Sequence, residues 1–591
     1  MKKYALGIEF GSTRIKAVAI DEKYVPISSG DYTWKSTYEN GIWTYDMAQV
    51  WEGLKAALSG VSVRDEIGAV GISGMMHGYL AFDKDWNLLV PFRTWQNTIT
   101  GPAAAELTEA FGFNVPQRWS IAHLYQAILN GEEHLPQLAH ITTLAGYVHY
   151  MLTGVNAIGI GEASGMFPID SDKLCYDEQM LRKFDGLVEG KGLPWAHLTD
   201  ILPQVLVAGE HAGSLTEAGS ALLDGLLAPG IPFAPPEGDG PTGMTATNAV
   251  APRTGNVSAG TSIFSMVVLE QPLKKVYEEI DLVTTPTGKP VAMVHCNNCT
   301  NDTNAWAAVL KETAQLFGTD PTNGELFTKL YQKSLEGDAD CGGVLVCNYM
   351  AGEGITHLDS GRPMVIRMPG SKFTLANFFR SQLYSTMATL RLGMEILEKE
   401  SVAIDSLTGH GGLFKTPGVG QRYLAAACNT SVTCMTTAGE GGPYGMALLA
   451  AYSANKKDGE TLEDYLNTYV FKNVESVTVK ADDCDIKGFN DYMENYKKLR
   501  TKIMYKLKQQ DGKIILITSV MENEGKSTVA ANIALTLAQK SNKVVLLDGD
   551  IRRPAIYKIL QQNLSKEQEI GEFLKELRKA KGLTQEQFAE Q

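Results

Sequence analysis

The segment from Pro235 to Ser262 carries side chains suited to phosphoryl transfer. It reads PPEGDGPTGMTATNAVAPRTGNVSAGTS, with Asp239 between two glycines and ahead of a helix-like run. A carboxylate in such a turn can act as a general base on a substrate hydroxyl. A second glycine turn, Gly260-Thr261-Ser262, follows about twenty residues later, and its N–H and O–H donors suit a phosphate. Together with the first strand of the chain, this segment predicts an enzyme that phosphorylates a small polyhydroxylated molecule.

The chain opens with a turn of the same kind. YALGIEFGSTRIKAVAID predicts two strands, 4–10 and 15–20, joined at Gly11-Ser12-Thr13. Gly11 lets the backbone approach a phosphate, while Ser12 and Thr13 donate hydrogen bonds to its oxygens. Such a turn is also common as an ordinary hairpin, so its function depends on partner motifs that follow in order.

Alternating strands and helices must position these turns. Apolar strands and amphipathic helices alternate to about residue 250, and a second series runs from about 251 to 480. Both series begin with a strand, a glycine turn and another strand. This pattern predicts two related α/β units that face one cleft.

Composition and charge exclude several classes of protein. The chain has 591 residues, 44% of them apolar and 20% charged, which is typical of a globular protein with more than one core. No apolar run reaches membrane-spanning length and the eight cysteines are scattered, so we expect a cytoplasmic protein without a membrane partner. Residues 497–591 carry 18 Lys and Arg against 11 Asp and Glu, which is a net charge of +7. Since the whole chain has a net charge of −14, residues 1–496 carry −21. This acidic body argues against nucleic acid as the main partner.

Residues 1–496 resemble the FGGY carbohydrate kinases, a branch of the actin–hexokinase–Hsp70 fold. The motifs that carry the resemblance lie in the family's order: GIEFGSTRIKAV, GISGMMHGYLAFD, EGDGPTGM, GNVSAGTS, GHGGL and GEGGPYGMALLAA. The resemblance implies an α/β fold with two actin/hexokinase-like (ribonuclease H-like) domains around a cleft. Residues 1–250 would bind the sugar and residues 251–496 the nucleotide. It further implies ATP and Mg²⁺ as cofactors, a small-molecule sugar as substrate and a possible homodimer.

The resemblance also assigns roles to residues of these motifs. Asp239 would be the general base that takes the proton from the attacking sugar hydroxyl. Glu9, at a position where the family usually has aspartate, would hold Mg²⁺ through water together with Asp239. ATP and its phosphates would be bound by Gly11, Ser12, Thr13, Gly260, Thr261, Ser262, Gly411, Gly412, Gly441 and Gly442.

The sugar would lie against Met76, His77, Gly78, Trp95 and Asn97. The Met-His-Gly triplet looks most like the xylulokinases within the family, and His77 could donate to a substrate hydroxyl. Asn97 stands where xylulokinase-like sequences carry an aspartate. An amide both donates and accepts, so the recognised hydroxyl pattern is expected to differ. We therefore expect a ketose or a related polyol as substrate.

The segment His295-Cys296-Asn297-Asn298-Cys299 suggests a zinc or redox site. A single CxxC lacks the second ligand pair of a structural zinc site, and no thioredoxin-like context surrounds it. We expect buried free thiols.

The chain changes character at a basic, helix-like linker around residues 496–507. Residues 497–563 resemble the ATPase core of bacterial tyrosine kinases. Two predicted strands and one helix cannot bury a parallel sheet on both faces, so we expect an incomplete and inactive P-loop fragment. Its phosphate-binding and carboxylate positions would be Gly525, Lys526, Ser527, Asp548 and Asp550.

Residues 564–591 resemble the opening helices of a lambda-repressor-like helix-turn-helix domain that lacks its recognition helix. We therefore expect short C-terminal helices without DNA binding. Two truncated domains behind a kinase look like a fusion or a joined reading frame.

Three hypotheses about function stay open. The first is an ATP-dependent ketose kinase, or a kinase for another polyol such as a tetrulose, a hexulose or a glycerol-like alcohol. The second is a tyrosine kinase or polysaccharide regulator that acts through the C-terminal P-loop. The third is a non-catalytic regulator that binds a nucleotide or a sugar.

Overall fold

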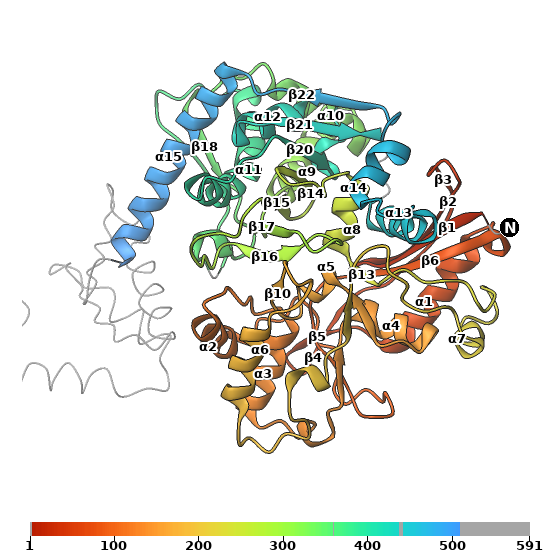
Figure 1. Cartoon of the computed structure of the whole chain (residues 1–591). Helices are drawn as coiled ribbons and strands as arrows, with labels where there is room; N and C mark the ends of the chain where they lie inside the picture. The colour runs from red at the N-terminus through yellow and green to blue at the C-terminus, as the bar shows by residue number, and fades with distance from the viewer. Residues whose placement is uncertain (1–2, 359, 437–440, 509–591) are drawn as a thin grey trace, which may run out of the picture. The chain divides into compact units, whose positions relative to one another are not determined.

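The computed structural model describes residues 3–358, 360–436 and 441–508 (Figure 1). The chain divides into a unit of Met1–Lys497 and a unit of Lys498–Gln591. Within the described residues, the second unit contributes only the last turns of one helix. No helix in this described part of the chain is long and apolar enough to cross a membrane.

A five-stranded sheet organises the first part of the chain, with strand order β13-β6-β1-β2-β3. Its strands are β1 (Tyr4–Phe10), β2 (Arg14–Ile20), β3 (Pro26–Thr33), β6 (Ile67–Gly74) and β13 (Glu237–Gly238). Strands β1, β2 and β3 form an antiparallel meander, whereas β6 runs parallel to β1, and β13 parallel to β6. The two predicted opening strands are confirmed, and the second begins one residue earlier than expected. The carboxyl ends of β1, β6 and β13 meet at one edge of the sheet.

Helices and short strand pairs surround this sheet. The helices are α1 (Met47–Gly60), α2 (Gly101–Phe111), α3 (Ser120–Asn130), α4 (Leu144–Thr153), α5 (Ile160–Ala163), α6 (Glu178–Val188) and α7 (Glu217–Leu222). The short strands are β4 (Thr37–Glu39), β5 (Ile42–Thr44), β7 (Leu80–Phe82), β8 (His140–Thr142), β9 (Ala157–Gly159), β10 (Ile169–Asp170), β11 (Cys175–Tyr176) and β12 (Gln204–Leu206). Single 3-10 turns lie at Arg64–Glu66, Leu135–Gln137 and Leu198–Asp200.

A seven-stranded sheet organises the rest, with strand order β16-β17-β15-β14-β20-β21-β22. Its strands are β14 (Thr254–Ala259), β15 (Ile263–Val268), β16 (Asp281–Thr284), β17 (Pro290–Cys296), β20 (Ser406–His410), β21 (Ser431–Met435) and β22 (Ser476–Val479). The β14–β15 hairpin is antiparallel and β20 runs parallel to β14. Because β1, β2 and β6 are arranged in the same way, the predicted relation between the two α/β units is confirmed.

The remaining helices of the described residues lie from Asp239 onward (Figure 1). They are α8 (Asp239–Ala246), α9 (Asn301–Leu316), α10 (Asn323–Ser334), α11 (Leu375–Lys399), α12 (Val419–Cys428), α13 (Gly441–Asn455), α14 (Leu462–Tyr465) and α15 (Asp483–Lys508). A two-stranded sheet pairs β18 (Val344–Cys347) with β19 (Met364–Arg367). Short turns of helix lie at Cys341–Gly343, Gly354–Thr356, Gly412–Phe414 and Leu466–Val470.

Helix α13 packs on the first sheet although it follows all but one strand of the second. Gly7 of β1 lies so close to α13 that a Cβ there would be 2.0 Å from the Pro443 carbonyl oxygen. A Cβ on Gly445 of α13 would lie 1.9 Å from the Thr242 carbonyl oxygen in α8. Glycine at these two positions lets α13 contact both β1 and α8, so the two sheets are joined through this pair of helices (Figure 1).

The predicted linker helix is confirmed, but it starts earlier than expected because α15 begins at Asp483. The P-loop positions Gly525, Lys526, Ser527, Asp548 and Asp550 and the segment resembling a helix-turn-helix domain lie outside the described residues.

Candidate active site

Asp239 lies at the junction between β13 and α8. Strand β13 pairs in parallel with β6, which sets Gly238 beside Gly74. The Asp239 Oδ1 atom accepts hydrogen bonds from the Gly240 N–H (3.0 Å) and from the Met76 N–H (3.2 Å). The candidate base and the candidate sugar segment, 163 residues apart in sequence, are therefore bonded to each other.

Asp239 is open to solvent and is also surrounded by protein atoms. Its side chain is exposed to solvent. Nevertheless, burial among neighbouring protein atoms raises its pKa, and the bonds from Met76 and Gly240 oppose this shift. Solvent therefore reaches a carboxylate whose surroundings favour its protonated form. A substrate hydroxyl can reach a carboxylate in that position.

Glu9 provides a second carboxylate at the same edge of the sheet. Burial and then the charge of Asp239 raise the pKa of Glu9 to about 8, while Lys16 lowers it. A Cβ on Gly442 would lie 1.9 Å from Glu9 Oε1 and 3.0 Å from Thr242 Oγ1. The Glu9 carboxylate thus occupies space that only a glycine leaves free at the start of α13.

These two acids fit the requirements of a magnesium–nucleotide complex. Mg²⁺ in kinases is usually bound by one or two carboxylates, waters and substrate phosphates. Among the described residues, no group of three or more His, Cys, Asp or Glu side chains is arranged to hold a metal by itself. The charge of Asp239 raises the pKa of Glu9, and a divalent cation bound near both carboxylates would reduce this repulsion.

Both glycine turns are fixed by neighbouring groups while their threonine side chains stay exposed. In the first turn, Trp34 Nε1 donates to the Gly11 carbonyl (2.7 Å) and the Tyr45 hydroxyl to the Ser12 carbonyl (2.8 Å). In the second, the Thr300 hydroxyl donates to the Gly260 carbonyl (2.7 Å). A fixed backbone with exposed threonine side chains is an arrangement that suits phosphate binding.

The other candidate ATP residues divide between the two turns. Gly411 has φ +101°, and a Cβ there would lie 2.4 Å from the Ala259 carbonyl oxygen, next to the Gly260 turn. Its neighbour Gly412 follows directly, whereas Gly442 lies at Glu9 near the first turn. The structure therefore sets one glycine pair beside each hairpin, and their contact with a nucleotide stays a prediction.

His77 is prepared to accept a hydrogen bond, not to donate one as expected from the sequence. Its Nδ1 lies 3.1 Å from the Gly165 carbonyl oxygen, and since that oxygen can only accept, Nδ1 carries the proton. Burial and the charge of Arg118 hold the pKa of His77 well below its usual range, so the ring is neutral. Its Nε2 is then an acceptor for a substrate hydroxyl.

The side-chain amide of Asn97 is hydrogen-bonded to backbone groups. Its amide group donates to the carbonyls of Trp43 (2.8 Å) and Thr94 (2.9 Å) and accepts from the Trp43 N–H (2.8 Å). The side chain is only 2% exposed. A sugar hydroxyl could accept from Asn97 only by displacing one of these bonds. The geometry therefore makes Asn97 a residue that joins β5, which contains Trp43, to the segment of Thr94. The neighbouring Trp95 is half-buried.

Some residues of this region carried no signal in the sequence. Glu237 accepts from the backbone N–H groups of Gly161 (3.3 Å) and Glu162 (2.8 Å) and so anchors the strand before Asp239. Arg118 lowers the pKa of His77 through its charge.

Cys296 and Cys299 are free and buried, as predicted. Burial raises the pKa of Cys299 to about 12. Neutral thiols of this kind are poor metal ligands and poor nucleophiles.

Most of the chain matches the two domains of one known protein family. The N-terminal domain of the FGGY family of carbohydrate kinases matches residues 4–245, and the C-terminal domain of that family matches residues 255–454. A xylulose kinase from Haemophilus influenzae is 20% identical over 376 residues, which cover 62% of this chain and 71% of that protein.

Solved structures share the fold. Two are from Lactobacillus acidophilus: a xylulose kinase (TM-score 0.70, 16% identity, 85% of this chain and 98% of that one) and a gluconate kinase (TM-score 0.69, 16% identity, the same coverage). The same fold thus occurs in proteins named for different substrates, so the fold alone does not select the sugar.

The C-terminal residues resemble other proteins. Residues 511–581 match a model described as an NUBPL iron-transfer P-loop NTPase. Tyrosine-protein kinase YwqD from Bacillus subtilis is 42% identical over 64 residues, which are 11% of this chain and 27% of that protein.

Proposed function

The chain belongs to the FGGY family of carbohydrate kinases, and we propose that it transfers the γ-phosphate of ATP to a hydroxyl of a pentulose-like ketose. The observation that carries the proposal is the direct bond between Asp239 and the backbone of Met76. It sets a solvent-exposed carboxylate against the Met-His-Gly segment, which resembles that of xylulokinases. The similar xylulose kinases support a ketose as the acceptor.

In the proposed reaction, Asp239 takes the proton of the attacking sugar hydroxyl. Its Oδ1 is held by two backbone N–H groups, which leaves Oδ2 to face the substrate. His77 Nε2 accepts from a second hydroxyl and orients the sugar. Positioning of this kind supplies more of the acceleration than the base itself.

The two glycine turns would hold the phosphates from opposite sides. Their free N–H and O–H groups would bind the phosphate oxygens of ATP. Glu9 and Asp239 would hold Mg²⁺ through water, and when bound the ion neutralises charge on the phosphates.

Replacement of Asp239 by Asn tests the proposal. We expect the wild-type protein to release ADP from Mg-ATP with a ketose, in a panel of pentuloses, hexuloses, tetruloses and glycerol. Asp239→Asn should lower kcat by roughly 100- to 10,000-fold, which is the usual contribution of a general base, without weakening nucleotide binding. The exposed Asp224 provides a control, since Asp224→Asn should change nothing. Turnover of Asp239→Asn near the wild-type rate would rule out its role as base.

We further propose that the P-loop segment contributes no kinase activity. The matching tyrosine kinase is covered over only 27% of its length. Lys526→Ala should therefore leave ketose-dependent ADP release unchanged, and tyrosine autophosphorylation that depends on Lys526 would contradict this.

A further inference from the structure

The loop between β17 and α9, residues 297–300, is bonded to the second glycine turn. The Cys299 N–H donates to the Thr261 carbonyl (3.0 Å). Thr300 donates to the Gly260 carbonyl through both its N–H (3.2 Å) and its hydroxyl (2.7 Å). This loop therefore engages both carbonyls of the turn, whereas the Thr261 side chain stays exposed. The position of the turn thus depends on the position of the loop.

A buried carboxylate anchors the beginning of this loop. Glu353, between β18 and β19, accepts from the N–H groups of Asn297 (3.3 Å) and Asn298 (3.2 Å). It also accepts from Nδ2 of the Asn298 side chain (3.0 Å), whose Oδ1 in turn accepts from the Ala351 N–H (2.8 Å). Two consecutive backbone N–H groups are thus fixed directly before Cys299, which reaches the turn.

Burial makes the loop sensitive to this carboxylate. Glu353 and Asn298 are each only 1% exposed. Burial raises the pKa of Glu353, and the bonds from Asn298 and Asn297 oppose that shift. Asn348, from the segment that leads to Glu353, adds a bond from its Nδ2 to the Cys299 carbonyl (2.9 Å). A buried carboxylate needs such bonds to compensate for its lost hydration, so a weaker acceptor at this position would disturb the loop.

We propose that Glu353 is a positioning residue for ATP, because it holds residues 297–300 and thereby sets the Gly260-Thr261 turn where it binds phosphate. The inference rests on the proposed role of this turn in the kinase and extends that role to a residue outside the turn. It also assigns a function to the segment from Cys296 to Cys299, which acts through its two asparagines and not through its thiols.

Glu353→Gln tests this role with an almost unchanged side-chain shape. The change replaces one carboxylate oxygen by an NH2 group, which cannot accept from the loop. A buried N–H group of Asn297 or Asn298 then lacks its acceptor, so the loop and the turn shift. Loss of a hydrogen bond to a charged group typically weakens binding about tenfold or more. We therefore expect an effect on the ligand that the turn holds and none on the sugar.

The measurement compares the nucleotide with the sugar. In Glu353→Gln, the Kd of Mg-ADP, measured by calorimetry on the full chain, should rise about tenfold, with a parallel rise in KM for ATP. KM for the ketose that the wild type uses best should stay unchanged. Glu325→Gln is the control and should change neither, because Glu325 also accepts from a backbone N–H, that of Thr322 (2.9 Å), but at the start of α10. An equal rise in both KM values would show a general structural loss and overturn the positioning role.

A double-mutant cycle shows whether Glu353 acts through the turn. Thr261→Ala removes the exposed hydroxyl that would bind phosphate. Residues that act through one another are not additive, so Glu353→Gln should raise the Kd of Mg-ADP by a smaller factor in the Thr261→Ala background than in the wild type. The same factor in both backgrounds would overturn the inference.

ADP binding separates this inference from the proposed ketose kinase. A wild type that binds no Mg-ADP overturns both. If the wild type binds Mg-ADP but phosphorylates no ketose, the proposed function is wrong and the ADP affinities alone decide on Glu353. A Glu353→Gln variant with the wild-type affinity overturns only the positioning role.

A second variant decides if Glu353→Gln does not fold, as thermal unfolding would show. The exposed Asn297 side chain donates from Nδ2 to the Gly352 carbonyl (2.9 Å), a bond that also ties the loop to the segment of Glu353. Asn297→Ala removes this bond and should raise the Kd of Mg-ADP about threefold. An unchanged affinity in this variant would overturn the inference.

Discussion

At the candidate active site, the carboxylate of Glu9 occupies the space that a side chain at Gly442 would need. Gly442 lies within α13 and has no left-handed backbone conformation, unlike Gly441, whose φ is +69°. Its missing side chain is therefore explained by the Glu9 carboxylate, 1.9 Å from where a Cβ would lie. The same carboxylate would hold Mg²⁺ in the proposed reaction. A glycine at this position is thus needed to leave room for the carboxylate that would hold Mg²⁺.

Gly442→Ala should impair the metal site without unfolding the protein. A Cβ would push the flexible Glu9 carboxylate away, and loss of such a supporting contact typically costs 10- to 100-fold in activity or metal affinity. Alanine also favours the helix by about 1 kcal/mol, so stability should be retained. ADP release titrated with Mg²⁺, together with thermal unfolding, checks both effects.

Gly186→Ala is the matched control. Gly186 also lies in a helix, α6, and a Cβ added there would have no neighbour within 4 Å among the described residues. This substitution should leave the Mg²⁺ dependence unchanged. If the Gly442→Ala enzyme kept the wild-type Mg²⁺ dependence, Glu9 would not be a residue that holds the metal.

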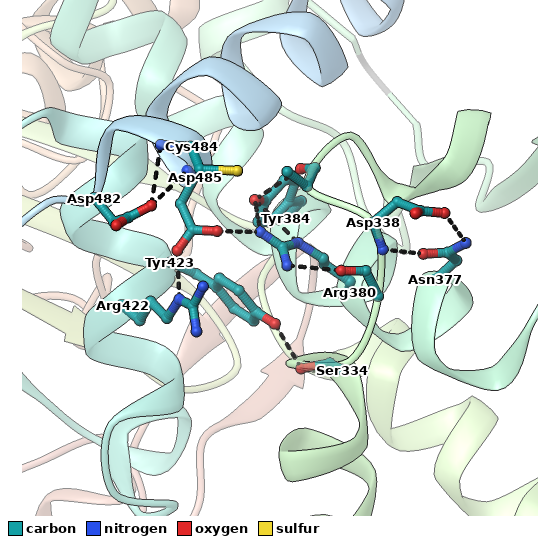
Figure 2. A network of polar contacts seen from close by, with 12 residues as sticks. Ser334, Asp338, Asn377, Arg380, Tyr384, Arg422, Tyr423, Asp482, Cys484 and Asp485 are labelled. Carbon is teal, nitrogen blue, oxygen red and sulfur yellow. Dashed lines mark hydrogen bonds and ion pairs between the residues drawn. The ribbon is translucent and has the colours of Figure 1, made fainter.

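Among the helices, the first turn of α15 connects α11 and α12 through ion pairs. Figure 2 shows Asp485 of α15 between Arg380 of α11 and Arg422 of α12. Arg380 also donates to the Tyr384 hydroxyl (2.8 Å) and to the Gly337 carbonyl (3.1 Å). Burial alone would raise the pKa of Asp485, but the bonds from both arginines outweigh it and the pKa is lowered. The carboxylate therefore stays charged and bridges the helices.

Asp485→Asn should destabilise the second half of the kinase strongly. Arg380 is only 2% exposed, and a buried charge left without its partner typically costs about 3–5 kcal/mol. Urea unfolding measures the loss. Asp482→Asn is the control, because the exposed Asp482 caps α15 through the N–H of Cys484 (3.0 Å) and asparagine caps helices equally well. Equal stability of the two variants would show that the bridge contributes nothing.

At the scale of the whole molecule, α15 is part of the kinase before it leads into the tail. Phe489, Tyr492, Met493 and Tyr496 of this helix are buried. The Tyr492 hydroxyl donates to the Val346 carbonyl (2.9 Å), and Lys497 pairs with Glu395. The first compact unit accordingly ends at Lys497, one residue beyond the limit of 496 expected from the sequence. The domain limits at residues 250 and 496 stay proposals.

A chain that ends at Lys508 should keep the sugar-dependent ADP release and the thermal stability of the full chain. A chain that ends at Ala481 lacks α15 and should not fold stably, since removal of even one large buried aromatic side chain costs about 3–5 kcal/mol. Thermal unfolding and ADP release of both chains provide the test. Loss of activity in the chain ending at Lys508 would mean that residues 509–591 contribute to the kinase.

The local structure of this protein follows from short stretches of its sequence. Both glycine hairpins, the helix that follows Asp239 and the buried thiols of Cys296 and Cys299 could be predicted. Turn chemistry and the alternation of strands are encoded within a few residues. The order of the motifs then led to the family and to the two-domain fold.

Which of these residues come into contact depends on how the strands and helices pack. Met76 reaches Asp239 because β13 pairs in parallel with β6, and Gly442 reaches Glu9 because α13 packs on β1. The acceptor role of His77 and the pairing of Arg118 with Asp281 likewise depend on neighbours distant in sequence. Protonation states and pairings are set by what surrounds a group in space, and a one-dimensional pattern does not contain that information.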